Sequence, residues 1–198
     1  MGIATGMYYT PAGGDIMFVE AAVRRVRRAA SETHAPEDGP LLDAADVSLI
    51  LTGQLGDVMR ESARAALTYV TNHARELHLP SELGTLEVHV HVPAGAVPKD
   101  GPSAGVTIAT ALASALTQKP VRKEVAMTGE ITLNGRVLAI GGVKEKLLGA
   151  KRAGVTRVLI PRANEADLDD LPADARESLH VELVDSLAQV FAAALRER

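Results

Sequence analysis

The most uniformly apolar stretch of the chain lies between residues 106 and 116. Valine, isoleucine, leucine and alanine fill it, and only Thr107, Thr110 and Ser114 interrupt them with small polar groups. A helix that is hydrophobic on nearly all sides is buried at the centre of a domain. The pattern therefore predicts a central helix over residues 106–116, with the other elements packed around it.

Helical patterns recur elsewhere in the chain. Residues 56–77 carry apolar side chains at spacings of three and four, which form one stripe on a long helix that Pro80 stops. Further helices are expected at residues 143–153, 164–168 and 185–195. The last of these is amphipathic, and Asp185 or Ser186 would supply its N-cap.

Strands are predicted mainly by alternation. Residues 86–92 alternate strictly, which indicates a half-buried strand with its valines inward and with His89 and His91 on the opposite face. Asn134-Gly135 between alternating residues predicts a hairpin over residues 131–140. Further strands are expected at residues 2–9, 15–23, 47–52, 124–128, 156–160 and 179–184, the first two as a hairpin around a turn at 11–14.

Strands and helices alternate irregularly along the chain, without internal repeats. This order predicts one α+β domain over residues 1–198, with mixed sheets and packed helices. Residues 24–46 differ from the rest, because two arginine pairs precede a polar run that contains Glu-Asp-Gly-Pro. We expect an exposed loop or insertion there.

Composition narrows the classes of protein that fit. The chain is 46% apolar and 23% charged, as in soluble globular proteins, and its net charge of -4 gives no support for nucleic-acid binding. It has no cysteine, which excludes disulfides, thiol nucleophiles and thiolate metal sites. There is no run of roughly 18 apolar residues for a membrane span, and no basic region followed by an apolar signal. We therefore expect an intracellular, cytoplasmic protein, either free or part of a longer chain.

Ser103 stands where a stiff glycine- and proline-bearing loop meets the central helix. Its hydroxyl could cap that helix, or it could be a nucleophile whose oxyanion meets the unpaired N–H groups of the helix start. Residues 101–105 match the G-x-S-x-G pattern of α/β-hydrolases, but no strand leads into them and the only later histidine is His180. An esterase of that type is therefore disfavoured.

The glycines of residues 101–105 also fit a phosphate site, because a helix N-terminus attracts anions. No P-loop pattern is present in the chain, which excludes that class of nucleotidase. A phosphate- or nucleotide-binding module of the sugar-kinase type stays open as the alternative function, although Asp100 would then lie close to the phosphates.

A serine nucleophile without histidine needs another base, and a neutral lysine can serve. Lowering a lysine pKa from about 10.4 to near 7.5 costs about 4 kcal/mol, so the amine must be desolvated. On the helix expected over residues 143–153, Lys146 lies about 40° from the apolar stripe, and Lys144 flanks its other side at about 60°. The geometry favours Lys146 mildly.

Two other polar features are candidates for a site. His89 and His91 share one strand face, as a paired-histidine metal site requires, but no third ligand stands at a useful spacing. Glu20 lies inside an apolar strand, where it either faces solvent or belongs to a site. We expect no metal and no organic cofactor in this chain.

Three long motifs follow one another in the chain. They are Pro-Lys-Asp-Gly-Pro-Ser-Ala-Gly at 98–105, Ala-Met-Thr-Gly-Glu-Ile-Thr-Leu-Asn-Gly at 126–135 and Gly-Gly-Val-Lys-Glu-Lys-Leu at 141–147. In order and spacing they resemble the proteolytic domain of Lon, the ATP-dependent protease. The resemblance covers residues 2–23 and about 47–198, and the segment between departs from it.

The resemblance implies a serine–lysine endopeptidase in which Ser103 is the nucleophile and Lys146 the general base. It places Thr128 where the family has a threonine that hydrogen-bonds this lysine. Supporting roles at most are implied for Asp100, Glu20, His89 and His91. Asp100, beside the nucleophile, would hold a closed, inactive loop by pairing with Lys146.

The resemblance further implies a fold related to a small-subunit ribosomal protein domain and to sugar kinases. The family works on unfolded or damaged proteins as a homo-hexamer, fed by an AAA+ ATPase domain that uses ATP and magnesium. These 198 residues contain no Walker motif, so that ATPase would lie in a longer chain or a separate partner. No contact with nucleic acid or membrane is expected through this domain.

Overall fold

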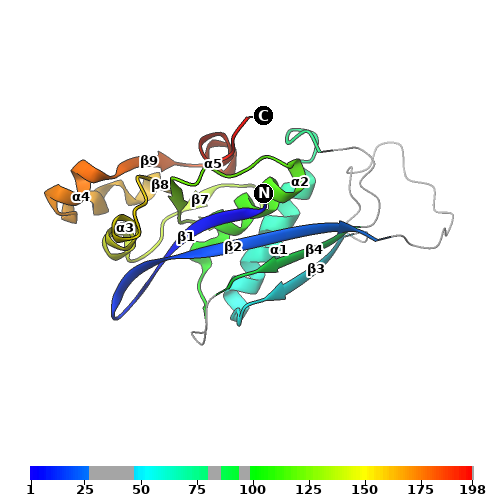
Figure 1. The fold of residues 1–198 in the computed structure, drawn as a ribbon, viewed down its shortest axis with the longest axis horizontal. Coiled ribbons are helices and arrows are strands. Elements are labelled where there is room, and N and C mark those ends of the chain that lie inside the picture. Colours follow the sequence, from blue (N-terminus) through cyan, green and yellow to red (C-terminus); the bar gives the residue numbers. More distant parts are fainter. Residues whose placement is uncertain (27–46, 80–85, 94–98, 198) are drawn as a thin grey trace.

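A mixed sheet runs through the molecule in the computed structural model, which describes residues 1–26, 47–79, 86–93 and 99–197 (Figure 1). Within these residues the sheet has seven strands, in the spatial order β3 (Val47–Thr52), β4 (Leu86–His91), β2 (Gly13–Arg25), β1 (Ile3–Thr10), β5 (Val125–Met127), β8 (Arg157–Pro161) and β9 (His180–Val184). The long β1–β2 hairpin lies at its centre. Pairing is antiparallel for β1–β2 and β2–β4 and parallel for the other neighbours.

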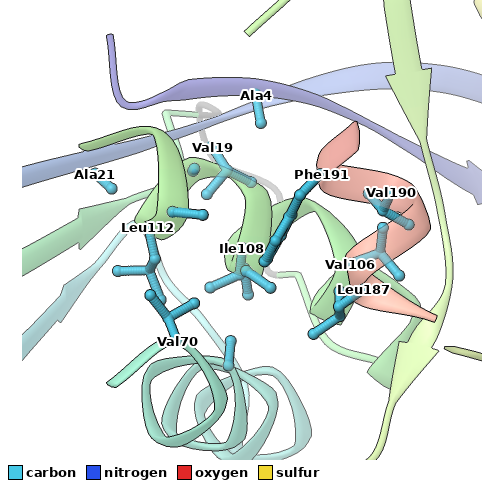
Figure 2. Close-up of a cluster of buried hydrophobic side chains, with 14 of the residues drawn as sticks. Ala4, Val19, Ala21, Val70, Val106, Ile108, Leu112, Leu187, Val190 and Phe191 are labelled. Atoms are coloured by element: carbon cyan, nitrogen blue, oxygen red, sulfur yellow. The ribbon is translucent and has the colours of Figure 1, made fainter. Parts of the chain in front are cut away.

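Three helices cover one face of the sheet. They are α1 (Asp57–Asn72), α2 (Gly105–Thr117) and α5 (Leu187–Ala194). As its composition predicts, α2 lies at the centre, and every residue from Gly105 to Leu116 is buried. Its aliphatic side chains pack between those of the sheet and those of α1 and α5 (Figure 2). In the described part of the chain, no helix combines the length and the hydropathy that crossing a bilayer requires.

Among the described residues, one half of the opposite face is covered, by α3 (Val143–Arg152), α4 (Ala173–Ser178) and the 3₁₀ segment η3 (Arg162–Asp170). Helix α3 approaches the β1–β2 hairpin so closely that no side chain fits between them. A Cβ on Gly149 would lie 2.4 Å from the carbonyl carbon of Gly14, and one on Gly14 would lie 1.8 Å from the carbonyl oxygen of Glu145. Two glycines thus set the distance between α3 and the sheet.

A small second sheet consists of the hairpin strands β6 (Glu130–Ile131) and β7 (Val137–Leu138). The prediction of a hairpin around Asn134-Gly135 is confirmed, and Gly135 has the positive φ of 76° that such a turn needs. Its strands are shorter than expected, since only Glu130–Ile131 and Val137–Leu138 pair. The N–H of Val137 points away from the hairpin and donates to the carbonyl oxygen of Asp185.

Several predicted boundaries need correction. The expected loop at 24–46 begins too early, because Arg24 and Arg25 are part of β2, where they pair with β4; residues 27–46 lie outside the described residues. Helix α1 ends at Asn72, well before Pro80, and its C-cap is His73. The short helix α4 was not expected from the sequence. Of the two N-caps predicted for α5, Asp185 and Ser186, the structure has Ser186, whose hydroxyl accepts from the Gln189 N–H.

We expect Gly149→Ala to lower the free energy of unfolding by about 1–3 kcal/mol, because the new methyl group collides with the backbone of the hairpin. Helix propensity alone predicts the opposite sign, a gain of about 1 kcal/mol. Urea unfolding measures the difference. Lys144→Ala, at an exposed position of the same helix, serves as control, and a stabilised Gly149→Ala variant would contradict the close packing of α3.

Candidate active site

Ser103 lies in a single 3₁₀ turn, η2 (Pro102–Ala104), directly before α2. Gly101 precedes the turn with φ 129°, a conformation that only glycine adopts readily, and the following proline fits the first position. The N-cap of α2 is Ala104 and no side chain caps either helix start. The capping interpretation of Ser103 is therefore wrong, and its half-buried hydroxyl is available for another role.

Thr128 and Gly129, which follow β5, hold the backbone of Ser103 by hydrogen bonds. The carbonyl oxygen of Ser103 accepts from the N–H of Gly129 at 2.9 Å and from the hydroxyl of Thr128 at 3.2 Å. The carbonyl oxygen of Gly129 in turn accepts from the Val106 N–H at 3.1 Å. A Cβ on Gly129 would lie 2.7 Å from the side chain of Val106, so this close approach requires glycine.

Lys146 projects from α3 into the interior and is only 2% exposed. Its Nζ donates to the hydroxyl of Thr128 at 3.2 Å and lies 5.7 Å from the centre of the Tyr9 ring. Burial lowers the pKa of this lysine from 10.5 to about 8, because the charged form loses its hydration. Lys144 is exposed. The helix geometry thus identified the buried lysine of the pair.

One cleft brings the two predicted catalytic groups together. Ser103 and Lys146 both line it, with Asp100, Gly101, Pro102, Tyr9, Glu130 and residues 139–141. Thr128 links the two halves, because its one hydroxyl accepts from the lysine and donates to the serine carbonyl. A hydroxyl and an amine with a depressed pKa in one cleft are the components of nucleophilic catalysis.

Asp100 lies at the rim of the cleft, but its carboxylate is directed at the start of α1. Its Oδ1 accepts from the Met59 N–H at 3.1 Å and from the Gly101 N–H at 2.9 Å. The N-cap of α1 is Gly56, which has no side chain to perform this task. Across the described ranges no ion pair joins Asp100 to Lys146, so this structure does not show the latch that the sequence suggested.

The structure does not bring the other three candidates to the cleft. Glu20 is exposed and pairs with Ile3, which is six residues, or about 20 Å, along β1 from Tyr9. His89 and His91 lie on β4, on the sheet face opposite to α1 and α2. The hydroxyl of Thr52 lies between them, 2.8 Å from one ring and 2.7 Å from the other.

Metal binding gains no geometric support from the described ranges. They contain no group of three or more histidine, cysteine or acidic residues that are positioned to hold an ion.

Sequence reasoning missed three residues at or behind the cleft. Tyr9 lies near the end of β1 and packs on Gly142, where a Cβ would lie 2.4 Å from its ring. Glu130 lines the cleft, and Asn164 supports its wall from behind. Their sequence signals were weak: a Tyr-Tyr pair before a turn, an acidic residue within the second motif, and a polar residue in a short helix. None of these has a diagnostic spacing.

Residues 41–197 match the family model of the Lon protease (S16) C-terminal proteolytic domain. The chain is 58% identical over 198 residues to Lon protease 1 of Sorangium cellulosum, an alignment that covers 100% of this chain and 22% of that protein. Lon protease 2 of Thermus thermophilus is 54% identical over 196 residues, with 98% and 22% covered. The Lon protease of Salinispora arenicola is 54% identical over 196 residues, with 98% and 23% covered. The chain thus spans about a fifth of the length of these curated relatives.

We expect Thr128→Val to lower the pKa of Lys146 below its value of about 8, because the ammonium loses the hydroxyl that accepts its hydrogen bond. Thr128→Ser keeps the acceptor and should leave the pKa near that of the parent chain. Carbon-13 NMR titration of labelled lysine side chains measures the shift, with the Lys146 signal assigned by its loss in Lys146→Met. An unchanged or raised pKa in Thr128→Val would show that this bond does not stabilise the charged amine.

Proposed function

This chain belongs to the Lon (S16) protease family, and we propose that it hydrolyses peptide bonds with Ser103 as nucleophile and Lys146 as general base. The observation that carries the proposal is the buried amine of Lys146, which has a pKa of about 8 and lies in the same cleft as the Ser103 hydroxyl. A lysine of ordinary pKa would be protonated at neutral pH and could not accept a proton.

In the proposed reaction the Ser103 hydroxyl oxygen attacks the carbonyl carbon of the scissile bond, and its proton passes to the neutral amine of Lys146. The resulting ammonium then gives a proton to the leaving nitrogen as the carbon–nitrogen bond breaks, which leaves an acyl-enzyme. A water molecule attacks this ester, Lys146 accepts a proton from it, and the proton returns to the Ser103 oxygen as the new carboxyl product departs.

Two features of the chain support these steps. The first N–H groups of the turn at Pro102–Ala104 lack partners within the turn and suit the oxyanion that forms next to Ser103. Thr128 holds the Lys146 amine through a single hydroxyl, which orients the amine without adding a negative charge that would raise its pKa. None of these steps calls for a metal or an organic cofactor.

We further propose that the longer protein to which this domain corresponds unfolds its substrates with a AAA+ ATPase domain, which would use ATP and magnesium. Its assembly would be a homo-hexamer, its substrates unfolded or damaged proteins, and its location the cytoplasm. The relatives' names and lengths support the first of these points, since they are called Lon protease and this chain spans only about a fifth of them.

We expect Ser103→Ala and Lys146→Met each to reduce kcat/KM on an unstructured peptide by roughly 10³-fold or more, and the double variant to be no worse than either, because the two groups act as one unit. Turnover of a quenched fluorescent peptide measures this. Methionine matches the length of the buried lysine without its charge, so stability should not fall. Normal turnover in Ser103→Ala would contradict the assignment of Ser103 as the nucleophile.

A labelling experiment separates this function from the phosphate-binding alternative. A peptide boronate or a fluorophosphonate should bind Ser103 in the parent chain and not in Ser103→Ala. The phosphate-binding alternative instead predicts that ATP or inorganic phosphate raises the melting temperature.

The rate should rise with pH. Because only the neutral amine accepts a proton, kcat/KM is expected to increase about tenfold per pH unit below the pKa and to level off above about pH 8. Thr128→Val should move this midpoint to lower pH. A flat profile between pH 6 and 9 would exclude a buried lysine as the base.

A folded substrate should resist this chain. We expect slow cleavage of an unfolded protein and no cleavage of a tightly folded one, since these 198 residues contain no Walker motif of an unfolding ATPase. Gel electrophoresis of the cleavage products compares one substrate protein in its folded form with a variant of it that destabilising mutations have unfolded. Rapid degradation of the folded form without ATP would contradict it.

A further inference from the structure

We propose that Glu130 is a specificity-determining residue of the cleft, and that its carboxylate binds a lysine or arginine side chain of the substrate close to the scissile bond. The proposal rests on the peptidase function above and names one chemical preference of that reaction. It gives the cleft a preference for cationic substrate residues over acidic ones.

The charges that line the cleft are the first argument. Among the described residues, the charged side chains of its lining are those of Asp100, Glu130 and Lys146. In the proposed reaction Lys146 is neutral when it accepts the proton of Ser103, so the charges that remain are two carboxylates. Carboxylates attract a substrate cation and repel a substrate anion.

The two carboxylates differ in what they already bind. Oδ1 of Asp100 accepts from the N–H groups of Met59 and Gly101 at 3.1 and 2.9 Å, which directs that side chain at the start of α1. Across the described ranges, no side-chain hydrogen bond or ion pair involves Glu130. Of the two, the carboxylate of Glu130 is therefore the one available to a substrate side chain.

The orientation of Glu130 follows from its place in β6. Side chains alternate along a strand, and Ile131, the other residue of β6, is buried. The Ile131 side chain packs at the start of α2, where a Cβ on Gly105 would lie 2.9 Å from it. Glu130 consequently points away from the core, and its half-buried side chain lies at the cleft wall.

Glu130 also lies close to the nucleophile along the chain of hydrogen bonds. Gly129, the residue before it, donates its N–H to the carbonyl oxygen of Ser103 at 2.9 Å. Standard bond lengths then place the Cα atoms of Ser103 and Glu130 roughly 10 Å apart at most. An extended substrate covers this distance with about three residues, so we expect the preferred cation within that range of the scissile bond.

Glu130 is not positioned to act as an acid or a base. Burial is what lowers the pKa of Lys146 to about 8, whereas a carboxylate in contact with the amine would raise it. Within the described residues no ion pair joins Glu130 to this lysine. Removing the charge of Glu130 should accordingly change the substrate preference and leave the midpoint of the pH profile in place.

The test is a series of quenched fluorescent peptides that differ at one residue. Each position within about three residues of the scissile bond carries lysine, norleucine or glutamate in turn, and norleucine keeps the lysine chain without its charge. At one of these positions we expect lysine to raise kcat/KM about threefold to fivefold over norleucine, and glutamate to lower it by a similar factor. Both effects should shrink in about 0.5 M salt, which screens the carboxylate.

Variants of the chain assign this preference to one residue. Glu130→Gln keeps the shape and removes the charge, so the three peptides should be cleaved at equal rates, while Glu130→Lys should reverse their order. Two matched controls should keep the order of the parent chain. Asp100→Asn retains an oxygen for the Met59 N–H, and Glu177→Gln removes a charge at an exposed position of α4, outside the cleft lining.

Three results would overturn the proposal: no preference in the parent chain, an unchanged preference in Glu130→Gln, or loss of the preference in Asp100→Asn. If Glu130→Gln does not fold, Glu130→Thr, which suits a strand, takes its place. The norleucine peptide tests the peptidase function separately. If this peptide is cleaved in a Ser103-dependent way, a negative result concerns Glu130 alone; if it is not cleaved, both proposals fail.

Discussion

An ammonium group that leaves water loses several kcal/mol of hydration, and Lys146 recovers little of it, because its polar partner in the described residues is one neutral hydroxyl. Its pKa of about 8 reflects this imbalance. The rest of the site keeps the amine dry. Helix α3 lies against the β1–β2 hairpin at a distance that Gly14 and Gly149 permit, and the ring of Tyr9 covers the amine from the side. Packing between a helix and a sheet thereby increases the share of the amine that is neutral and able to accept a proton.

Ser103 and Lys146, the two proposed catalytic residues, come from distant parts of the chain, yet both bond to one short segment. Thr128 and Gly129 leave the sheet at the end of β5, and from there one side chain reaches Lys146 while one N–H reaches the Ser103 carbonyl. A shift of this segment would move Ser103 and Lys146 together. Relative geometry within the cleft is therefore better protected than the position of either group in the molecule.

Much of the fold was predictable because its signals are local. The buried helix α2, the alternating strand β4 and the turn at Asn134-Gly135 each follow from side-chain periodicity or from one glycine. The identity of the buried lysine also followed, since Lys144 and Lys146 fall on different sides of the α3 stripe. Tyr9, Glu130 and Asn164 were missed because their roles depend on neighbours remote in sequence. The end of α1 and the extension of β2 through Arg25 were wrong in the prediction for the same reason, since tertiary contacts decide them.

The N-cap residue of α1, Gly56, has no side chain, and Asp100, three residues before Ser103, supplies the missing cap. A movement that takes Asp100 away from the Met59 N–H consequently also removes the cap of α1. A cap of this kind is worth about 1 kcal/mol, which corresponds to a population ratio of about five. Any arrangement in which Asp100 has left the Met59 N–H is therefore less stable by about this free energy. A ligand that binds the uncapped arrangement about five times more tightly would make the capped and uncapped arrangements equally populated. A modest difference in affinity is therefore enough to move Asp100.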